Sequence, residues 1–322
     1  GPPDQRLGDA HSAPHAPGEL ADARVHDGGE ADEREDAPDL VVAGLAVDPL
    51  LEDGDVVDEV EGAEVLVEAG FLGEVAEAPP HRQPALGGGG IDAQHLEVAG
   101  GYGERMLLSA PMLLEVPNGL AAEHAALTEP MAVGLHAVNK SGIGAGDGAL
   151  VLGCGPVGLA VLAALARRGI GPIVATDFSP SRRALAAGLG ADEVVDPAEE
   201  EAFAAWGRAG AGKPVVVFEA IGVPGIIDDA LRRAPVGTRI GVVGVCMQPD
   251  TIRPGFGIMK ELSLQFVFGY DPTEFADSLT AIAEGAVDVA PLITGEVGLD
   301  GVPGAFADLA DPQEHCKVLV VP

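Results

Sequence analysis

A glycine-rich hexapeptide is the segment of this sequence best suited to bind a ligand. Gly153-Cys154-Gly155-Pro156-Val157-Gly158 has the spacing G-x-G-x-x-G, follows the apolar run ALVL and opens an Ala/Leu-rich stretch. In a strand–turn–helix unit the first glycine permits a tight turn, the second lets the backbone approach a pyrophosphate, and the third allows the helix to pack closely on the strand. The amides at the start of the helix then face the anion. The motif predicts a dinucleotide site, against the alternative of a glycine-rich turn without a ligand.

An acidic residue at the end of the next apolar run indicates which dinucleotide is bound. Asp177 closes PIVATD, 19 residues beyond Gly158. A carboxylate at this point accepts hydrogen bonds from both ribose hydroxyls and repels a 2′-phosphate, so NAD is predicted over NADP. Arg182 and Arg183 follow closely and could soften that preference; the alternative is that they are solvated charges at the start of a helix.

A parallel α/β sheet must position these residues, and the sequence from Gly101 onward has its pattern. Val/Ile-rich runs alternate with Ala/Leu-rich stretches, each punctuated by Gly or Pro. Strands are expected over 148–154, 172–177, 193–196, 214–220, 238–245 and 262–270, and helices over 156–168, 181–189, 197–209 and 225–234. Six strands with crossover helices predict a doubly wound, Rossmann-type sheet. Another helix is expected over 124–141, with Thr128 as its N-cap and Pro130 in its first turn.

A Rossmann unit serves several enzyme classes, so other residues must decide the chemistry. Short-chain dehydrogenases need a catalytic Tyr followed four residues later by a Lys. The two tyrosines of this chain, Tyr102 and Tyr270, are followed at that distance by Met106 and Glu274. The short-chain class is therefore excluded.

Several segments resemble the medium-chain zinc-dependent alcohol dehydrogenases, specifically the sorbitol, butanediol and threonine dehydrogenase branch. The first is GGYGERMLLSAPMLLEVPNGLAAEHAALTEPMAVGLHAV, which precedes the glycine motif. The others are FEAIGVPG, RIGVVGVCMQPDTI, LQFVFGYDPTEFADSL, VDVAPLITGEVGLDGVPGAF and the closing HCKVLVVP. The resemblance covers residues 100–322 and implies an NAD-linked oxidoreductase in which a catalytic domain of the GroES-like type, degenerate or incomplete here, accompanies the Rossmann domain.

The resemblance also implies a role for each residue that matches the family's cofactor site. The pyrophosphate would be lined by Gly153, Gly155, Pro156, Val157 and Gly158, and the adenosine ribose by Asp177 with Arg182 beside it. Ile221 and Gly222 would flank the adenine. Val243, Gly244 and Val245 would flank the nicotinamide, and Gly269 and Tyr270 the nicotinamide ribose. Each of these positions is also an ordinary strand terminus, but ligands of open α/β sheets bind outside the carboxyl ends of the strands.

The matching catalytic residue is Glu129, in the triplet Thr-Glu-Pro. It is similar to the carboxylate that in this branch approaches the catalytic zinc, directly or through its water, and it is the only metal-ligand candidate that remains. The alternative is a first-turn acid favoured by the helix dipole. His136, seven residues later, is expected to be a packed or capping histidine rather than a ligand.

The family's remaining zinc ligands have no counterpart upstream. They comprise a Cys in a Cys-Gly-x-Asp motif, a His-Glu pair and a four-cysteine lobe, whereas no Cys precedes Cys154. No upstream histidine has a neighbouring Glu that could form the expected His-Glu pair; these histidines are His11, His15, His26, His81 and His95. In the family the zinc polarises the substrate oxygen, and a hydride passes to the nicotinamide. Because zinc needs three protein ligands, we expect this chain to bind no stoichiometric zinc and to oxidise alcohols feebly or not at all.

The first hundred residues differ in composition from the rest. They hold 24 acids, four Arg, no Lys and a single aromatic residue, Phe71, and residues 1–38 are expected to be disordered. One explanation for residues 1–90 is an out-of-frame reading of GC-rich DNA, and the other is a natural relative whose catalytic domain was replaced by an acidic segment. We favour the first, because HRQPALGGGGIDAQHLEVAGGYGERM resembles the end of the family's lobe without its cysteines. The coding DNA decides between them.

Composition limits the partners and the compartment. A net charge of −33 argues against nucleic-acid and membrane-surface binding, and no apolar run is long enough to span a bilayer. Three scattered cysteines and an opening GPPDQRLGDA without a leader predict a cytoplasmic protein. The family implies a small alcohol or polyol as substrate and a homodimer or homotetramer.

The expected organisation has four parts. Residues 1–100 form the atypical acidic segment, 101–142 the remaining catalytic-domain strand and linking helix, 143–285 the NAD-binding domain, and 286–322 the return to the catalytic domain. Two rival functions stay open. One is a zinc-free medium-chain reductase of the quinone type, against which the Thr-Glu-Pro triplet argues, and the other is a catalytically silent NAD-binding protein.

Overall fold

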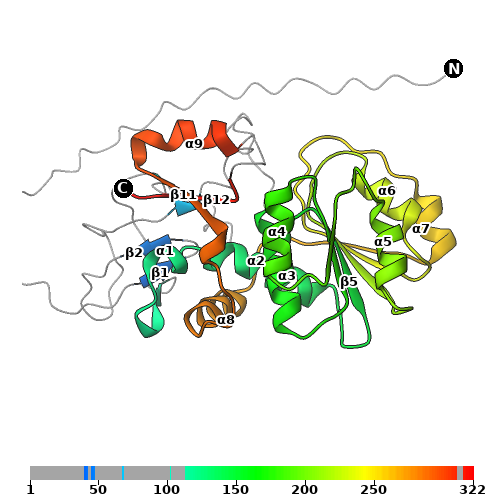
Figure 1. Cartoon of the computed structure of the whole chain (residues 1–322), viewed down its shortest axis with the longest axis horizontal. Helices are drawn as coiled ribbons and strands as arrows, with labels where there is room; N and C mark the ends of the chain where they lie inside the picture. The colour runs from blue at the N-terminus through cyan, green and yellow to red at the C-terminus, as the bar shows by residue number, and fades with distance from the viewer. Residues whose placement is uncertain (1–39, 43–44, 48–66, 69–101, 103–112, 310–314) are drawn as a thin grey trace, which may run out of the picture. The chain divides into compact units, whose positions relative to one another are not determined.

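The computed structural model describes residues 40–42, 45–47, 67–68, 102, 113–309 and 315–322 (Figure 1). Most of the acidic first hundred residues, and with them the expectations on zinc ligands, disorder and reading frame, therefore lie outside the described residues. The GroES-like domain implied by the resemblance also lies largely outside them. No helix in the described ranges is long and apolar enough to cross a membrane.

A six-stranded parallel sheet forms the centre of the described chain, in the order β10-β9-β8-β5-β6-β7. Its strands are β5 (Gly148–Leu152), β6 (Ile173–Thr176), β7 (Glu193–Val195), β8 (Val215–Glu219), β9 (Arg239–Val242) and β10 (Ser263–Phe266). Every residue of β5, β6 and β8 is buried, as expected for strands covered by helices on both faces. The doubly wound fold predicted from the sequence is confirmed, and the strand order reverses between β5 and β8.

Helices cover the two faces of this sheet (Figure 1). They are α3 (Pro156–Arg167), α4 (Pro180–Gly188), α5 (Ala202–Ala209), α6 (Ile226–Arg233) and α7 (Pro254–Lys260). Alternate strand residues enter two separate cores: Ala149 and Val151 of β5 pack with α3, whereas Leu150 and Leu152 pack with α5 and α6. This alternation is the two-residue period of a strand.

Two further helices extend the α3 side of the core. They are α2 (Thr128–Lys140), which packs against α3, and α8 (Pro272–Ala283), which packs against α2. The α2 and α3 backbones approach closely at Gly134, where an added Cβ would lie 2.4 Å from the backbone carbon of Ala160. A short helix, α1 (Ala122–Ala125), precedes α2.

Two three-stranded sheets complete the described elements. The first joins β1 (Leu40–Val42), β2 (Leu45–Val47) and β4 (Leu114–Glu115) in the order β2-β1-β4. The second joins β3 (Val67–Glu68), β11 (Ile293–Val297) and β12 (Lys317–Val320) in the order β11-β12-β3. Helix α9 (Val302–Leu309) connects β11 to the final strand, and short 3₁₀ turns cover Pro117–Gly119, Ala290–Leu292 and Leu299–Gly301.

Several expected boundaries were wrong. Thr128 is not the N-cap of α2: its Oγ1 donates to the carbonyl of Ala125, and Leu127 takes the capping position, so the expected helix 124–141 is broken between α1 and α2. The helix expected over 197–209 begins only at Ala202, because the Glu201 carboxylate caps it. The last two strands end at Val242 and Phe266, short of the expected 245 and 270.

Candidate functional site

The carboxyl ends of β5, β6, β8 and β9 meet at one edge of the sheet, and the glycine motif lies there. Gly153 follows β5 with φ 90°, and an added Cβ would lie 2.8 Å from Ile221 and 3.1 Å from the Ala220 carbonyl. A Cβ on Gly158 would lie 2.0 Å from the Gly153 carbonyl oxygen. The tight turn and the close helix packing thus both require glycine.

The start of α3 is open to a ligand. Gly155 is its N-cap and supplies no side-chain hydrogen bond, while Pro156 and the half-buried Val157 form the first helical positions. The first amides of a helix lack intrahelical partners and carry a partial positive charge. A Cβ on Gly155 would meet only the Arg182 guanidinium, 3.9 Å away, so the backbone here is accessible to an anion.

Asp177 follows β6 directly and orders the glycine turn. Its Oδ2 accepts the amide of Cys154 at 2.8 Å, and its Oδ1 accepts the amide of Ser179 at 2.8 Å. Burial, and then the Asp177 charge, raise the pKa of the Cys154 thiol to about 12, so this cysteine is a protonated, inert part of the turn.

The two arginines after Asp177 differ in the contacts that their guanidinium groups make. Arg183 donates to the carbonyls of Asp177 and Phe178 and forms an ion pair with Asp196 at 2.9 Å. Arg182 leaves its buried Nε without a hydrogen-bond partner in the described part of the chain. Arg183 is therefore committed to the fold, whereas the charge of Arg182 remains available beside Gly155.

Two turns after β8 and β9 lie beside the glycine turn, at the edge where the strand order reverses between β5 and β8 and where open α/β sheets form their ligand crevice. Gly222 has φ 74°, and a Cβ there would lie 2.7 Å from the amide nitrogen of Val245. Ile221 and Val245 are 42% and 48% exposed, and Val243 is buried. Apolar side chains that are exposed at a strand-end crevice suit the flat faces of a nucleotide.

A carboxyl lies where α2 begins, and a phenol lies just before α8 begins. Glu129 is the second residue of α2, and burial raises its pKa to about 7. Tyr270 follows Gly269, whose φ is 65°, and its ring packs on Phe275 with centroids 5.5 Å apart. Burial, and then the charge of Glu129, raise the pKa of Tyr270.

The described residues do not provide a zinc ligand set around Glu129. Within them, one group of three His, Cys, Asp or Glu ligand atoms lies within 4.8 Å of one another: His136, Asp271 and Glu274. Its central carboxylate already accepts His136 Nδ1 at 2.6 Å, the Asp271 amide at 2.8 Å and the Asn139 side chain. The group is therefore a satisfied hydrogen-bond network between α2 and α8, and Glu129 is outside it. Sequence reasoning missed this network, because Glu274 lies 138 residues from His136.

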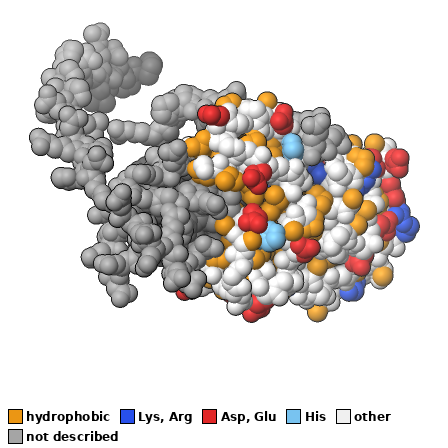
Figure 2. Space-filling model, turned by 60° about the vertical axis from the view of Figure 1, so that its left-hand side comes forward, with side chains coloured by type: hydrophobic (Ala, Val, Ile, Leu, Met, Phe, Trp, Pro, Cys, Tyr) orange, Lys and Arg blue, Asp and Glu red, His pale blue; other side chains and the backbone are white. Residues whose placement is uncertain are grey.

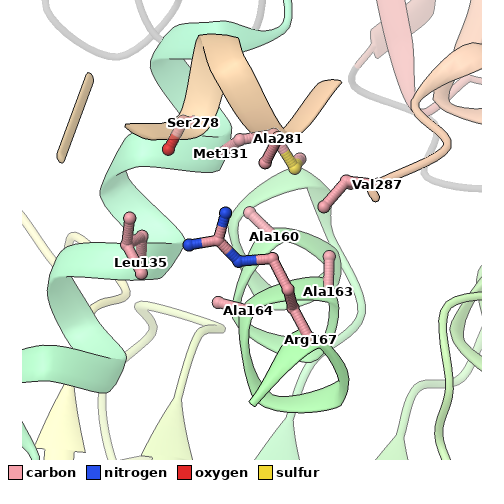
Figure 3. Close-up of a pocket in the computed structure, with 9 residues that line it drawn as sticks. All are labelled: Met131, Leu135, Ala160, Ala163, Ala164, Arg167, Ser278, Ala281 and Val287. Atoms are coloured by element: carbon pink, nitrogen blue, oxygen red, sulfur yellow. The ribbon is translucent and has the colours of Figure 1, made fainter. Parts of the chain in front are cut away.

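Two hollows near α3 do not belong to this crevice. One is a pocket of about 20 Å³ between α2, α3 and α8, and Figure 3 shows Arg167 extending beside it from α3 toward α2. The other, about 440 Å³, is an open groove lined by α3, α4 and residues 286–291. The first is too small for a cofactor, and neither is lined by a residue of the glycine motif.

Figure 2 shows carboxylates scattered among apolar and neutral side chains over the face that it presents.

Comparison with known proteins identifies related dehydrogenases. Residues 156–284 match the family model described as zinc-binding dehydrogenase. The chain is 33% identical to (R,R)-butanediol dehydrogenase of Bacillus subtilis over 225 residues, which are 69% of this chain and 64% of that protein. It is 28% identical to sorbitol dehydrogenase of the same organism over 228 residues, 70% of this chain and 64% of the relative.

A solved structure extends the match. The crystal structure of 2R,3R-butanediol dehydrogenase from Bacillus subtilis is 30% identical and aligns with a TM-score of 0.64 over 84% of this chain and 76% of that one. The chain covers less than two thirds of the length of both curated relatives.

Proposed function

Because the chain belongs to the zinc-dependent medium-chain alcohol dehydrogenase family, we propose that it binds NAD at the carboxyl edge of its six-stranded sheet. The parent reaction is hydride transfer between a secondary alcohol or polyol and the nicotinamide. The observation that carries the proposal is the uncapped start of α3 between the glycine turn and Arg182. These groups suit a pyrophosphate, since a helix start and a guanidinium without an ion pair in the described residues both favour an anion.

The rest of the crevice fits the other parts of the cofactor. The Asp177 carboxylate would accept the ribose hydroxyls and oppose a 2′-phosphate, which favours NAD over NADP. The turn of Ile221 and Gly222 suits the adenine, and the turn of Val243, Gly244 and Val245 suits the nicotinamide. Gly269 and Tyr270 would complete the nicotinamide ribose side, next to Glu129.

We further propose that alcohol oxidation by this chain is impaired. Glu129 is one carboxylate, and no zinc ligand set includes it among the residues that the structure describes, so the fit to zinc fails there. A chain that binds NAD without oxidising alcohols is the alternative function. Residues 101–142 and 286–322 stay assigned to the catalytic domain, and 143–285 to the NAD-binding domain, as proposals.

Alcohol-dependent NADH formation, measured together with zinc by elemental analysis, tests the impairment. We expect little NADH formation from butane-2,3-diol or sorbitol, and less than one zinc per chain. One zinc per chain together with NADH formation that Glu129→Ala abolishes would contradict the impairment and show that residues outside the described ranges complete the site.

A homodimer is the assembly that we propose, with a homotetramer built from two of them as the alternative. β10 is an outer strand of the six-stranded sheet as described, and Phe266 and Phe268 are 64% and 61% exposed there. Residues 251–270 carry two basic side chains and one acid, in a chain of net charge −33. An uncharged strand edge can pair with its own copy across a two-fold axis, and two acidic chains meet most easily where acids are few.

The proposed compartment is the cytoplasm, because all three cysteines are free thiols. The proposed substrate is a small alcohol or polyol. Nucleic acids and membrane surfaces are not expected to bind, since a net charge of −33 repels phosphate groups.

A further inference from the structure

Glu219, the last residue of β8, has a carboxylate to which the family resemblance gave no role, and the residue is only 1% exposed. Its Oε1 accepts hydrogen bonds from the amides of Ile221 and Gly222, each at 2.8 Å. Burial raises the pKa of this carboxyl, and the two amide hydrogen bonds oppose that rise. A buried carboxylate is costly unless such donors compensate for its desolvation, so this side chain and the turn stabilise one another.

The backbone of the same residue holds the neighbouring turn. The carbonyl of Glu219 accepts the amides of Val243 at 2.8 Å and Gly244 at 2.9 Å. One residue therefore anchors both the turn after β8 and the turn after β9.

The two turns touch at their glycines. A Cβ on Gly244 would lie 2.3 Å from the amide nitrogen of Gly222, and a Cβ on Gly222 would lie 2.7 Å from that of Val245. Because the backbones are in direct contact, a displacement of the first turn must displace the second.

We propose that Glu219 is a positioning residue for the cofactor crevice. Its carboxylate holds the Ile221–Gly222 turn in the conformation that receives the adenine half of the dinucleotide, and the contact between Gly222 and Gly244 extends this constraint to the nicotinamide side. The inference rests on the proposed function, since it assumes that NAD occupies this crevice. A preorganised wall spares the cost of ordering the turn on binding, so loss of the carboxylate appears as weaker cofactor binding.

Glu201 provides a matched control. Its carboxylate also accepts two backbone amides, those of Phe203 and Ala204, at 3.0 Å each. It caps α5, after the outer strand β7, and contributes to neither turn of the crevice. Leucine at either position leaves two amides without their acceptor, whereas glutamine retains an oxygen that can accept them.

The experiment titrates the full chain with NADH, followed by fluorescence, and displaces the NADH with AMP; thermal unfolding midpoints are recorded for every variant. We expect Glu219→Leu to lower the midpoint more than Glu201→Leu, because Glu219 is buried whereas the Glu201 side chain is 35% exposed. Glu219→Leu should weaken NADH and AMP at least about tenfold, because it leaves buried donors unsatisfied in the crevice wall. Glu201→Leu should leave both affinities unchanged, and Glu219→Gln should restore most of the loss.

Equal effects of Glu219→Leu and Glu201→Leu on NADH affinity would overturn the inference, as would an unchanged affinity in Glu219→Leu. Should Glu219→Leu not fold, Gly222→Ala displaces the same turn with the carboxylate intact. A comparable loss of affinity in that variant supports the inference, and unchanged affinity contradicts it. If the unsubstituted chain bound neither NADH nor AMP, the proposed function itself would fail, and this inference with it.

Discussion

Asp177 combines a structural task with the proposed choice of cofactor. Its carboxylate holds the amides of Cys154 and Ser179, and its charge faces the position proposed for the ribose. We expect Asp177→Ser to shift the ratio of NADP to NAD affinity toward NADP by about tenfold, because the charge that opposes a 2′-phosphate is removed. Fluorescence titrations with NADH and NADPH measure this ratio.

Asp192→Ser is the control for that substitution. The Asp192 carboxylate also accepts a backbone amide, that of Ile173 at 2.7 Å, but at the opposite end of β6. Its loss should leave the cofactor ratio unchanged. An unchanged ratio in Asp177→Ser as well would show that Asp177 is not at the ribose.

Arg182 should contribute to affinity rather than to the fold. Its Nε is buried without a partner in the described residues, and its guanidinium lies beside Gly155. We expect Arg182→Met to weaken NADH binding by about tenfold and to reduce its salt dependence, since a charge-assisted contact to the pyrophosphate is lost. Arg167→Met, at the far end of α3, removes an exposed arginine as a control. Equal affinities of the two variants would contradict the role of Arg182.

The local part of the site could be predicted from the sequence, and the long-range part could not. The spacing of Gly153, Gly155 and Gly158 and the place of Asp177 at a strand end are properties of one strand–turn–helix unit, and the structure brings them together. The hydrogen bonds of Glu219 were missed, although a buried Glu at the end of an apolar strand is an unusual residue that could have drawn attention. The pairing of His136 with Glu274 depends on how two distant helices pack, which no spacing along the chain indicates.

The junction of α2 with α8 depends on one carboxylate. Burial by itself raises the pKa of Glu274, but hydrogen bonds from the Asp271 amide, Asn139 and His136 outweigh this effect and hold the pKa below its usual value. A carboxyl whose pKa is lowered in the folded state stabilises the fold above its unfolded pKa, and this contribution is lost as the pH falls through the folded value.

Glu274→Gln should therefore lower the stability by about 1–3 kcal/mol at pH 7, and the difference from the unsubstituted chain should shrink below about pH 4.3. Thermal or urea unfolding at a series of pH values measures it. Glu284→Gln, an exposed acid just after the same helix, should have little effect. A difference that stays constant down to pH 3.5 would contradict this account of Glu274.

Element type was easier to predict than element boundaries. The strands and the Ala/Leu-rich helices follow directly from hydrophobic patterns, because burial on both faces of the sheet demands apolar runs. The starts of α2 and α5 were misplaced because they depend on local side-chain hydrogen bonds: α2 has no side-chain cap, whereas α5 has one. Thr128 bonds back to Ala125, and Glu201 caps α5 five residues after Asp196.

The assembly proposed through the β10 edge is tested by placing a charge on it. We expect Phe266→Asp to convert the dimer into monomers, because it places like charges close together in a symmetric interface. Light scattering coupled to size-exclusion chromatography gives the mass. Val223→Asp adds an acid at another exposed apolar position, after β8, and should leave the mass unchanged. A monomeric unsubstituted chain would contradict the proposed interface.

The account depends most on the proposal that this chain binds NAD at the carboxyl edge of its six-stranded sheet. Titration of the full chain with NADH, followed by nicotinamide fluorescence and by thermal stabilisation, tests this directly. We predict saturable binding at one site per chain, displacement by AMP, and affinity for NADPH weaker by about tenfold, since Asp177 opposes a 2′-phosphate. Absence of saturation by NADH, with no thermal stabilisation, would contradict the account.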